Sequence, residues 1–184
     1  PFEGMPFQQM MNIPCELSLR RTAFGLRLAR RPVAEIERLR GRRHVAAPGP
    51  LGASGNPLPE LRTACFDLRA DIEVGTATAL VWRVSGNVLV LDVSRQRLIA
   101  GKAIIPVPLC EGRARLRLLA DRCLLECFAD DGLVYGAVPL LPAVGNAAGN
   151  GVTACGGEAR IRELVADELV SAWMPGVSGQ GAGR

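Results

Sequence analysis

The chain has 184 residues, of which 48% are hydrophobic and 22% are charged, and its formal net charge is +4. This length suits one domain with a substantial core, and the hydrophobic content excludes a disordered chain. No apolar run approaches the roughly 18 residues that a membrane-spanning helix needs, so no membrane partner is expected.

The first twenty residues read as the end of one structure rather than the start of another. They contain three Met and two Phe, and they begin without an initiator Met, a signal peptide or a turn that would open a domain. We therefore expect the chain to begin in mid-fold. From residue 15 the apolar side chains alternate, which predicts strands over residues 15–20 and 24–29 with a turn at 21–23.

A short helix and a loop are expected after this hairpin. Pro32 ends the second strand and suits the first turn of a helix. Helical spacing relates Val33, Ile36 and Leu39, so a short helix is predicted over residues 32–40. Residues 45–59 are rich in Pro and Gly and predict a loop.

Residues 38–44 (RLRGRRH) form a dense arginine cluster. Such a cluster can bind phosphate, but we favour the more ordinary interpretation, a solvated face of a linker. No aromatic residue is interleaved with these arginines, so the cluster offers no platform for stacking bases. No nucleic-acid partner is therefore expected.

An alternating strand is predicted over residues 66–74. Its apolar side chains occupy every second position: Phe66, Leu68, Ala70, Ile72 and Val74. Charged side chains occupy the positions between them: Asp67, Arg69, Asp71 and Glu73. This separation predicts a half-buried antiparallel strand, and its register should be fixed because a one-residue slip would place four charges in the core.

Further short strands and turns follow to the end of the chain. Hairpins are predicted over residues 78–84 with 88–93, turning at 85–87, and over 114–120 with 123–129, turning at 121–122. Another strand is expected over residues 133–139, a Gly/Asn-rich turn over 145–151 and a disordered tail over 175–184. Residues 157–173 allow either a strand or a helix. Many short strands with Gly/Pro turns predict an all-β sandwich or barrel.

The six cysteines and the single histidine predict no metal or cofactor site. No C-x-x-C spacing occurs, and His44 lies inside the arginine cluster. Cys123 and Cys127 share one face of a strand, yet they stand too far apart along it to form a disulfide. Buried free thiols are the simpler interpretation, and the redox compartment stays open.

Four segments, in this order, resemble glycoside hydrolase family 32, which contains invertases, levanases and inulinases. Residues 5–20 (MPFQQMMNIPCELSLR) resemble the segment that closes the catalytic propeller of that family, and residues 26–40 (LRLARRPVAEIERLR) resemble the link to its C-terminal domain. Residues 66–73 (FDLRADIE) are similar to an early strand of the C-terminal sandwich. Residues 116–132 (LRLLADRCLLECFADDG) resemble its hairpin, with Cys123 where the family usually has Ser. Within the family, the segments MPFQQMM and PCELSLR are most similar to bacterial levanases and inulinases.

The resemblance implies a two-sheet antiparallel β-sandwich of the jelly-roll, concanavalin-like type, preceded by a remnant of a five-bladed β-propeller. The implied division is a remnant of the last blade over residues 1–30, a linker with a short helix over 31–60, the sandwich over 61–174 and the tail over 175–184. It also favours strands over residues 157–173, ending at Trp173. Met5, Phe7, Met10 and Met11 would then face a neighbouring propeller.

Two of the catalytic motifs that the resemblance implies, W-M-N-D-P-N and R-D-P, are absent from this sequence. The family uses an Asp in W-M-N-D-P-N, an Asp in R-D-P and a Glu in E-C, and retaining chemistry needs two carboxyl groups about 5–5.5 Å apart. Glu126-Cys127 matches E-C in letters but lies in the sandwich hairpin. Cys15-Glu16 and the pair Asp130-Asp131 are interpreted as structural. We therefore assign no catalytic, cofactor-binding or metal-binding residue, and no cofactor is expected.

Two functions from different classes fit these observations, and a third, weaker one is a fragment of a fructosyltransferase, which this sequence does not distinguish from a hydrolase. The first is a non-catalytic C-terminal sandwich of a β-fructosidase acting on sucrose, levan or inulin, whose partner is the propeller of the same protein. The second is a stand-alone carbohydrate-binding module, for which Trp82 and Trp173 are the candidate stacking residues. A second copy of the chain is a further candidate partner. Localisation stays open, with a secreted or periplasmic bacterial parent as the option that the resemblance offers.

Overall fold

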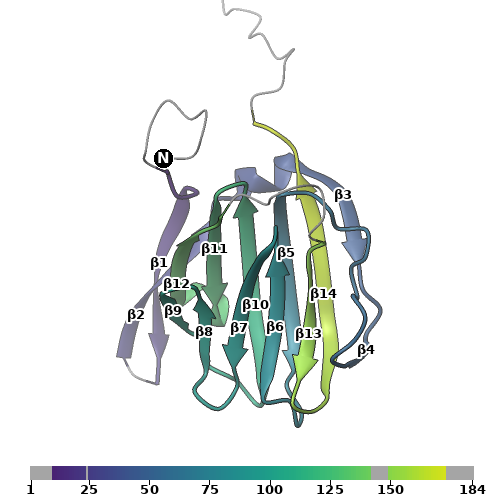
Figure 1. Cartoon of the computed structure of the whole chain (residues 1–184). Helices are drawn as coiled ribbons and strands as arrows, with labels where there is room; N and C mark the ends of the chain where they lie inside the picture. The colour runs from purple at the N-terminus through teal and green to yellow at the C-terminus, as the bar shows by residue number, and fades with distance from the viewer. Residues whose placement is uncertain (1–9, 24, 142–148, 173–184) are drawn as a thin grey trace, which may run out of the picture.

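The structure is a computed structural model that describes residues 10–23, 25–141 and 149–172. Within these ranges it consists of two stacked antiparallel sheets and a separate hairpin (Figure 1). No helix in the described ranges is long and apolar enough to cross a membrane.

The larger sheet has seven strands in the described residues, in the order β12–β11–β10–β5–β14–β3, with β4 also paired to β14. Its strands are β3 (Arg40–Val45), β4 (Gly49–Leu51), β5 (Cys65–Glu73), β10 (Arg113–Asp121), β11 (Leu124–Ala129), β12 (Val134–Pro139) and β14 (Ala159–Leu169). The smaller sheet has the order β13–β6–β7–β8–β9. Its strands are β6 (Ala79–Val84), β7 (Asn87–Asp92), β8 (Arg97–Ala100), β9 (Ala103–Pro106) and β13 (Gly151–Cys155).

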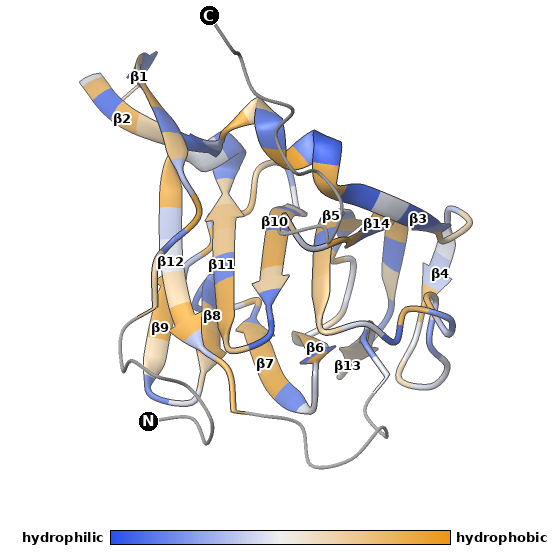
Figure 2. Cartoon of the chain, turned by 90° about the horizontal axis from the view of Figure 1, so that it is seen from above, coloured by the Kyte–Doolittle hydropathy of each residue, from blue (hydrophilic) through white to orange (hydrophobic). Residues whose placement is uncertain are grey.

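The hairpin consists of β1 (Cys15–Thr22) and β2 (Gly25–Pro32), which pair only with each other among the described strands. Two short three-ten helices, η1 (Ala34–Leu39) and η2 (Asp130–Gly132), follow β2 and β11. Seen from above, the two sheets form separate layers, the hairpin projects to one side, and η1 and β3 run along the outer side of the larger sheet (Figure 2).

The main core lies between the two sheets. The apolar side chains of β5 point into it, and the register sets Leu68 opposite Leu118 of β10. From the smaller sheet, Trp82 is the largest fully buried side chain, with 1% of its surface exposed. Burying side chains of this size stabilises the fold by about 1.5–3 kcal/mol each. The apolar side chains at alternate positions of β5 and β6 therefore favour the packing of one sheet on the other.

The predicted fold class, an all-β two-sheet sandwich, is confirmed. The segment expected as a short helix forms the three-ten helix η1, and residues 157–173 contain the strand β14. The turn at residues 85–87 tightens to Ser85-Gly86, whose φ angles of 46° and 81° suit a two-residue hairpin turn. The turn expected at residues 121–122 moves by one residue, because Asp121 still pairs with Leu124. The disordered tail, the turn at 145–148 and Trp173, Met5 and Phe7 lie outside the described residues.

Two strands lie in the segment predicted as a linker and a loop. Both β3 and β4 pair with β14, which has 11 residues and would otherwise leave one edge uncovered. The arginine cluster is consequently not a solvated face throughout: His44 is 7% exposed, and the Arg40 side chain is 15% exposed. The domain boundaries drawn from the sequence stay a prediction.

Part of the outer face of the larger sheet is covered by other segments of the chain, although the charged side of residues 66–74 predicted contact with solvent. A second apolar cluster forms there around Ile36, Leu119 and Phe128. Asp67, on the charged side of β5, is 0% exposed. The alternation of β5 therefore separates an apolar core from a buried polar layer, and the expectation of a half-buried strand is wrong for the part of β5 that contains Asp67.

Candidate functional site: a projecting hairpin and an arginine-rich sheet face

The β1–β2 hairpin presents four leucines to the surroundings on one of its faces. Leu19 lies directly opposite Leu28, and Leu17 and Leu26 occupy alternate positions on the same side. Their exposed fractions are 60% for Leu17, 71% for Leu19, 57% for Leu26 and 47% for Leu28. A two-stranded hairpin is marginally stable by itself. A leucine face of this kind is typical of a surface that packs against a neighbour.

Glu126 anchors the segment that leads into the hairpin. This side chain is 1% exposed, and its carboxylate accepts hydrogen bonds from the Ile13 backbone N–H at 2.6 Å and from the Tyr135 hydroxyl at 2.7 Å. Asn12 donates to the same hydroxyl at 2.5 Å. The Arg30 guanidinium lies 5.0 Å from the centroid of the Tyr135 ring. Tyr135, on β12 of the sandwich, therefore contacts both the segment that precedes β1 and Arg30 of β2.

Gly132 allows the hairpin to approach the sandwich closely. Its φ of 87° lies in the left-handed region that glycine favours, and a Cβ at this position would overlap the backbone carbonyl of Arg30. The helix η2 thus lies against the backbone of β2. This contact and the Glu126 anchor fix the direction in which the leucine face points.

Titration of Tyr135 gives a test of this anchor. Burial, with a further contribution from the hydrogen bond to Glu126, raises the pKa of Tyr135 above its usual value. A raised folded-state pKa contributes stability that is fully present below the unfolded pKa of about 10 and is lost as pH rises through the folded pKa. We expect the free energy of unfolding, measured by urea titration between pH 8 and 11.5, to fall less steeply for Tyr135→Phe than for the wild type.

The thiols alone do not separate the two pH profiles, because both proteins share them. Burial raises the pKa of Cys127 to about 12, and burial together with Glu126 raises that of Cys15. The difference between the two pH profiles therefore reports on the phenol together with the Cys15 thiol, whose charge also acts on Tyr135. Identical slopes above pH 10 would contradict the anchor.

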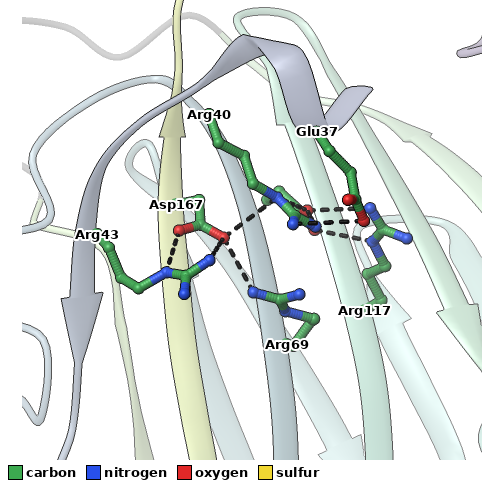
Figure 3. A network of polar contacts seen from close by, with 7 residues as sticks. Glu37, Arg40, Arg43, Arg69, Arg117 and Asp167 are labelled. Atoms are coloured by element: carbon green, nitrogen blue, oxygen red, sulfur yellow. Dashed lines mark hydrogen bonds and ion pairs between the residues drawn. The ribbon is translucent and has the colours of Figure 1, made fainter. Parts of the chain in front are cut away.

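The outer face of the larger sheet carries a network of four arginines and three carboxylates: Arg40, Arg43, Arg69, Arg117, Glu37, Asp67 and Asp167. Figure 3 labels its members other than Asp67. Asp67 accepts from Arg117 Nε at 2.8 Å and from Arg40 Nη2 at 2.9 Å. Asp167 accepts from Arg43 Nε at 2.6 Å and from Arg69 Nη2 at 2.9 Å. Arg40 Nε, 3.2 Å from Asp167, joins the two halves.

The strand register explains why the network is needed. It sets Asp67 opposite Asp167 and Arg69 opposite Arg117. Like charges in directly opposite positions destabilise a sheet. The ion pairs run diagonally instead, from Asp67 to Arg117 and from Arg69 to Asp167. Burial raises the pKa of Asp167, but the hydrogen bond and charge of Arg43, with Arg40 and Arg69, outweigh burial and leave that pKa below its usual value.

Comparisons with known proteins show which proteins the chain resembles. No protein-family model matches the chain. A levanase of Bacillus sp. (strain L7) is 23% identical over 165 residues, which cover 77% of this chain and 18% of the levanase. A levanase of Bacillus subtilis (strain 168) is 24% identical over 200 residues, covering 91% of this chain and 28% of the levanase.

Two solved structures have a similar fold. The exo-inulinase of Aspergillus awamori matches with a TM-score of 0.71 and 16% identity, covering 94% of this chain and 38% of the inulinase. A glycoside hydrolase family 32 structure from Bifidobacterium adolescentis matches with a TM-score of 0.53 and 18% identity, covering 89% of this chain and 26% of that one. The chain is similar to the C-terminal part of family 32 glycoside hydrolases. It spans less than a third of the length of either levanase.

The structure places the residues that were considered as catalytic candidates as follows. Glu126 of the E-C pair is the buried acceptor described above, and Glu16 is exposed on β1. The pair Asp130-Asp131 makes the tight turn of η2, with φ angles of 48° and 53°. All six cysteines are free, and no group of metal-binding side chains occurs in the described part of the chain.

Sequence reasoning missed the buried arginine network and the Glu126–Tyr135 contact. His44, which the sequence placed in an arginine-rich linker, lies on β3 with Nε2 2.8 Å from a Glu168 carboxylate oxygen. A usable signal was the alternation of Asp67, Arg69 and Asp71 along β5 together with the arginines at alternate positions of β10, a strand that the fold pairs with β5. The Glu126–Tyr135 contact left no such signal, because it depends on a diagonal across β11 and β12.

Proposed function

We propose that the chain is the non-catalytic β-sandwich module of a family 32 β-fructosidase acting on sucrose, levan or inulin. In this role it packs against a catalytic propeller of the same protein and stabilises it. The observation that carries the proposal is the leucine face of the β1–β2 hairpin, which is exposed here and held in a fixed direction by Glu126 and Gly132. The likeness to levanases supports the family of the partner.

The leucine face supplies the test. Without its propeller, the chain should cover these leucines with a second copy, so sedimentation velocity should show association that increases with concentration. The double variant Leu19→Ser/Leu28→Ser should remain monomeric. The control is Ile104→Ser, which removes a side chain that is 58% exposed on the smaller sheet. Association that survives the leucine changes and is lost in the control would contradict the proposal.

An activity measurement addresses the non-catalytic part of the proposal. The purified chain should release no fructose from sucrose, inulin or levan, because the carboxylate pair needed for retaining hydrolysis is not present in its sequence. Turnover by a clean preparation, proportional to the amount of chain, would overturn the proposal.

The carbohydrate-binding alternative lacks a supporting observation in the described residues. Trp82 points into the core, and the outer face of the smaller sheet carries a row of aliphatic side chains, Val81, Val90, Ile99 and Ile104, set opposite one another. Aliphatic side chains do not offer a sugar the flat ring surface of an aromatic platform. Calorimetric titration with levan and inulin separates the two functions, and saturable binding would favour the alternative.

A further inference from the structure

A cavity of about 450 Å³ opens on the outer face of the larger sheet, between that sheet and the base of the β1–β2 hairpin. Five arginines from three strands line it: Arg30, Arg31, Arg69, Arg115 and Arg117. Its apolar lining includes Leu116 and Phe128, both 4% exposed. A partly enclosed site of this kind strengthens interactions between its guanidinium groups and a charged ligand.

Positive charge is in surplus around this cavity. Asp67 and Asp167 are shared among the four arginines of the network, Glu37 adds a contact to Arg40, and Asp71 is shared by Arg113 and Arg115. No ion pair joins Arg30 or Arg31 to a carboxylate of the described residues. Among the residues that line the cavity, five arginines stand against three carboxylates, Asp71, Asp131 and Glu163, a surplus of two positive charges. Asp131, also in the wall, lies 3.9 Å from Arg20.

We propose that this cavity binds a phosphate group, either free or carried by a sugar. Arg117 and Arg69 are held in place by Asp67 and Asp167, so two guanidinium groups are positioned before any ligand arrives. Arg31 and Arg115 are exposed at the wall and supply donors that are unpaired or only weakly paired, since Arg115 Nε is 3.5 Å from Asp71. Guanidinium groups present paired donors that match the oxygens of a phosphate, and a dianion would offset the surplus charge.

Such a ligand would also join two parts of the fold. Arg31 belongs to the hairpin and Arg115 to the sheet, so a phosphate held by both bridges the hairpin to the sandwich. Binding to the folded state alone raises the free energy of unfolding. Phosphate should therefore raise the melting temperature of the chain. The measurement uses sulfate-free buffers in which the chloride concentration is adjusted to keep the ionic strength constant.

The experiment is calorimetric titration of the whole chain with inorganic phosphate, glucose 6-phosphate and glucose at fixed ionic strength. We expect one saturable site for a phosphate and no heat of binding with glucose. Comparable affinity for both phosphates indicates that the free ion is sufficient, whereas tighter binding of glucose 6-phosphate indicates that the sugar is also recognised.

Three variants decide whether the cavity is the site. Arg31→Gln/Arg115→Gln should weaken phosphate binding about tenfold or more, because two charge-assisted hydrogen bonds are lost. Glu163→Gln should tighten it, since it removes a carboxylate from the wall. Arg83→Gln removes an exposed arginine from the smaller sheet and should leave the affinity within about twofold of wild type. No saturable binding, or equal weakening in the double variant and Arg83→Gln, would overturn the proposal.

Discussion

Replacing Asp67 with Ala should lower the free energy of unfolding by about 3–5 kcal/mol, the usual cost of removing one partner of a buried ion pair. Asp67 is 0% exposed and accepts four hydrogen bonds from two arginines. Without it, Arg117 would face Arg69 across the sheet with no carboxylate between them. Urea denaturation followed by tryptophan fluorescence measures the loss.

Glu37→Ala is the matched control for this change. Glu37 belongs to the same network and lies 3.4 Å from Arg40, but its side chain is 62% exposed. An exposed ion pair contributes about 0–1 kcal/mol, so this variant should unfold close to wild type. Equal losses in the two variants would mean that the network contributes through general electrostatics rather than through buried charge, and would contradict the role given to Asp67.

The difference between Asp67 and Glu37 also marks the limit of sequence reasoning about this fold. The alternation along residues 66–74 predicts correctly which side of β5 meets the core, because the period of a strand is two residues. It does not say what covers the other side. That depends on η1 and β3, which reach this face through the pairing of β3 with β14, a contact between residues 120 or more positions apart in the sequence.

The sandwich and most of its hairpins were predictable for the same reason that β5 was. Hairpins such as β6–β7 and β10–β11 carry their turn and their alternation within about fifteen residues. The strands β3 and β4 carry neither signal: one is a run of arginines and the other is three residues containing Pro50. They become strands because β14 offers an unpaired edge, which is a tertiary cause.

The hairpin shows the same contrast between features that local sequence predicts and features that depend on tertiary contacts. The alternating leucines of β1 and β2 were readable from the sequence. The residues expected to face a neighbour were Met5, Phe7, Met10 and Met11 instead, so the exposed leucine face was not predicted. The junction was not predicted either, because Glu126 and Tyr135 come together only through the register of β11 with β12, which sets Glu126 opposite Ala137 and Tyr135 opposite Phe128. A buried carboxylate that accepts a backbone N–H from Ile13 has no local signature in the sequence.

Gly132→Ala should separate the hairpin from the sandwich while leaving the two main sheets folded. The left-handed backbone alone makes an alanine here unfavourable by about 1–3 kcal/mol. The added Cβ would also overlap the carbonyl of Arg30, a backbone atom that cannot turn aside as a side chain can. We expect hydrogen exchange of the β1 and β2 amides to accelerate well beyond that of β5 and β10.

Gly101→Ala separates backbone strain from this overlap. Gly101 has a φ of 57°, but nothing lies within 4 Å of the position that its Cβ would take. Its loss should be about 1 kcal/mol from conformation alone, with no change in exchange of the hairpin. If Gly132→Ala had the same small effect, the close approach of η2 to β2 would not hold the hairpin. The leucine face would then lack the fixed direction that docking against a propeller requires. This pair of variants therefore tests the proposed function in the chain alone.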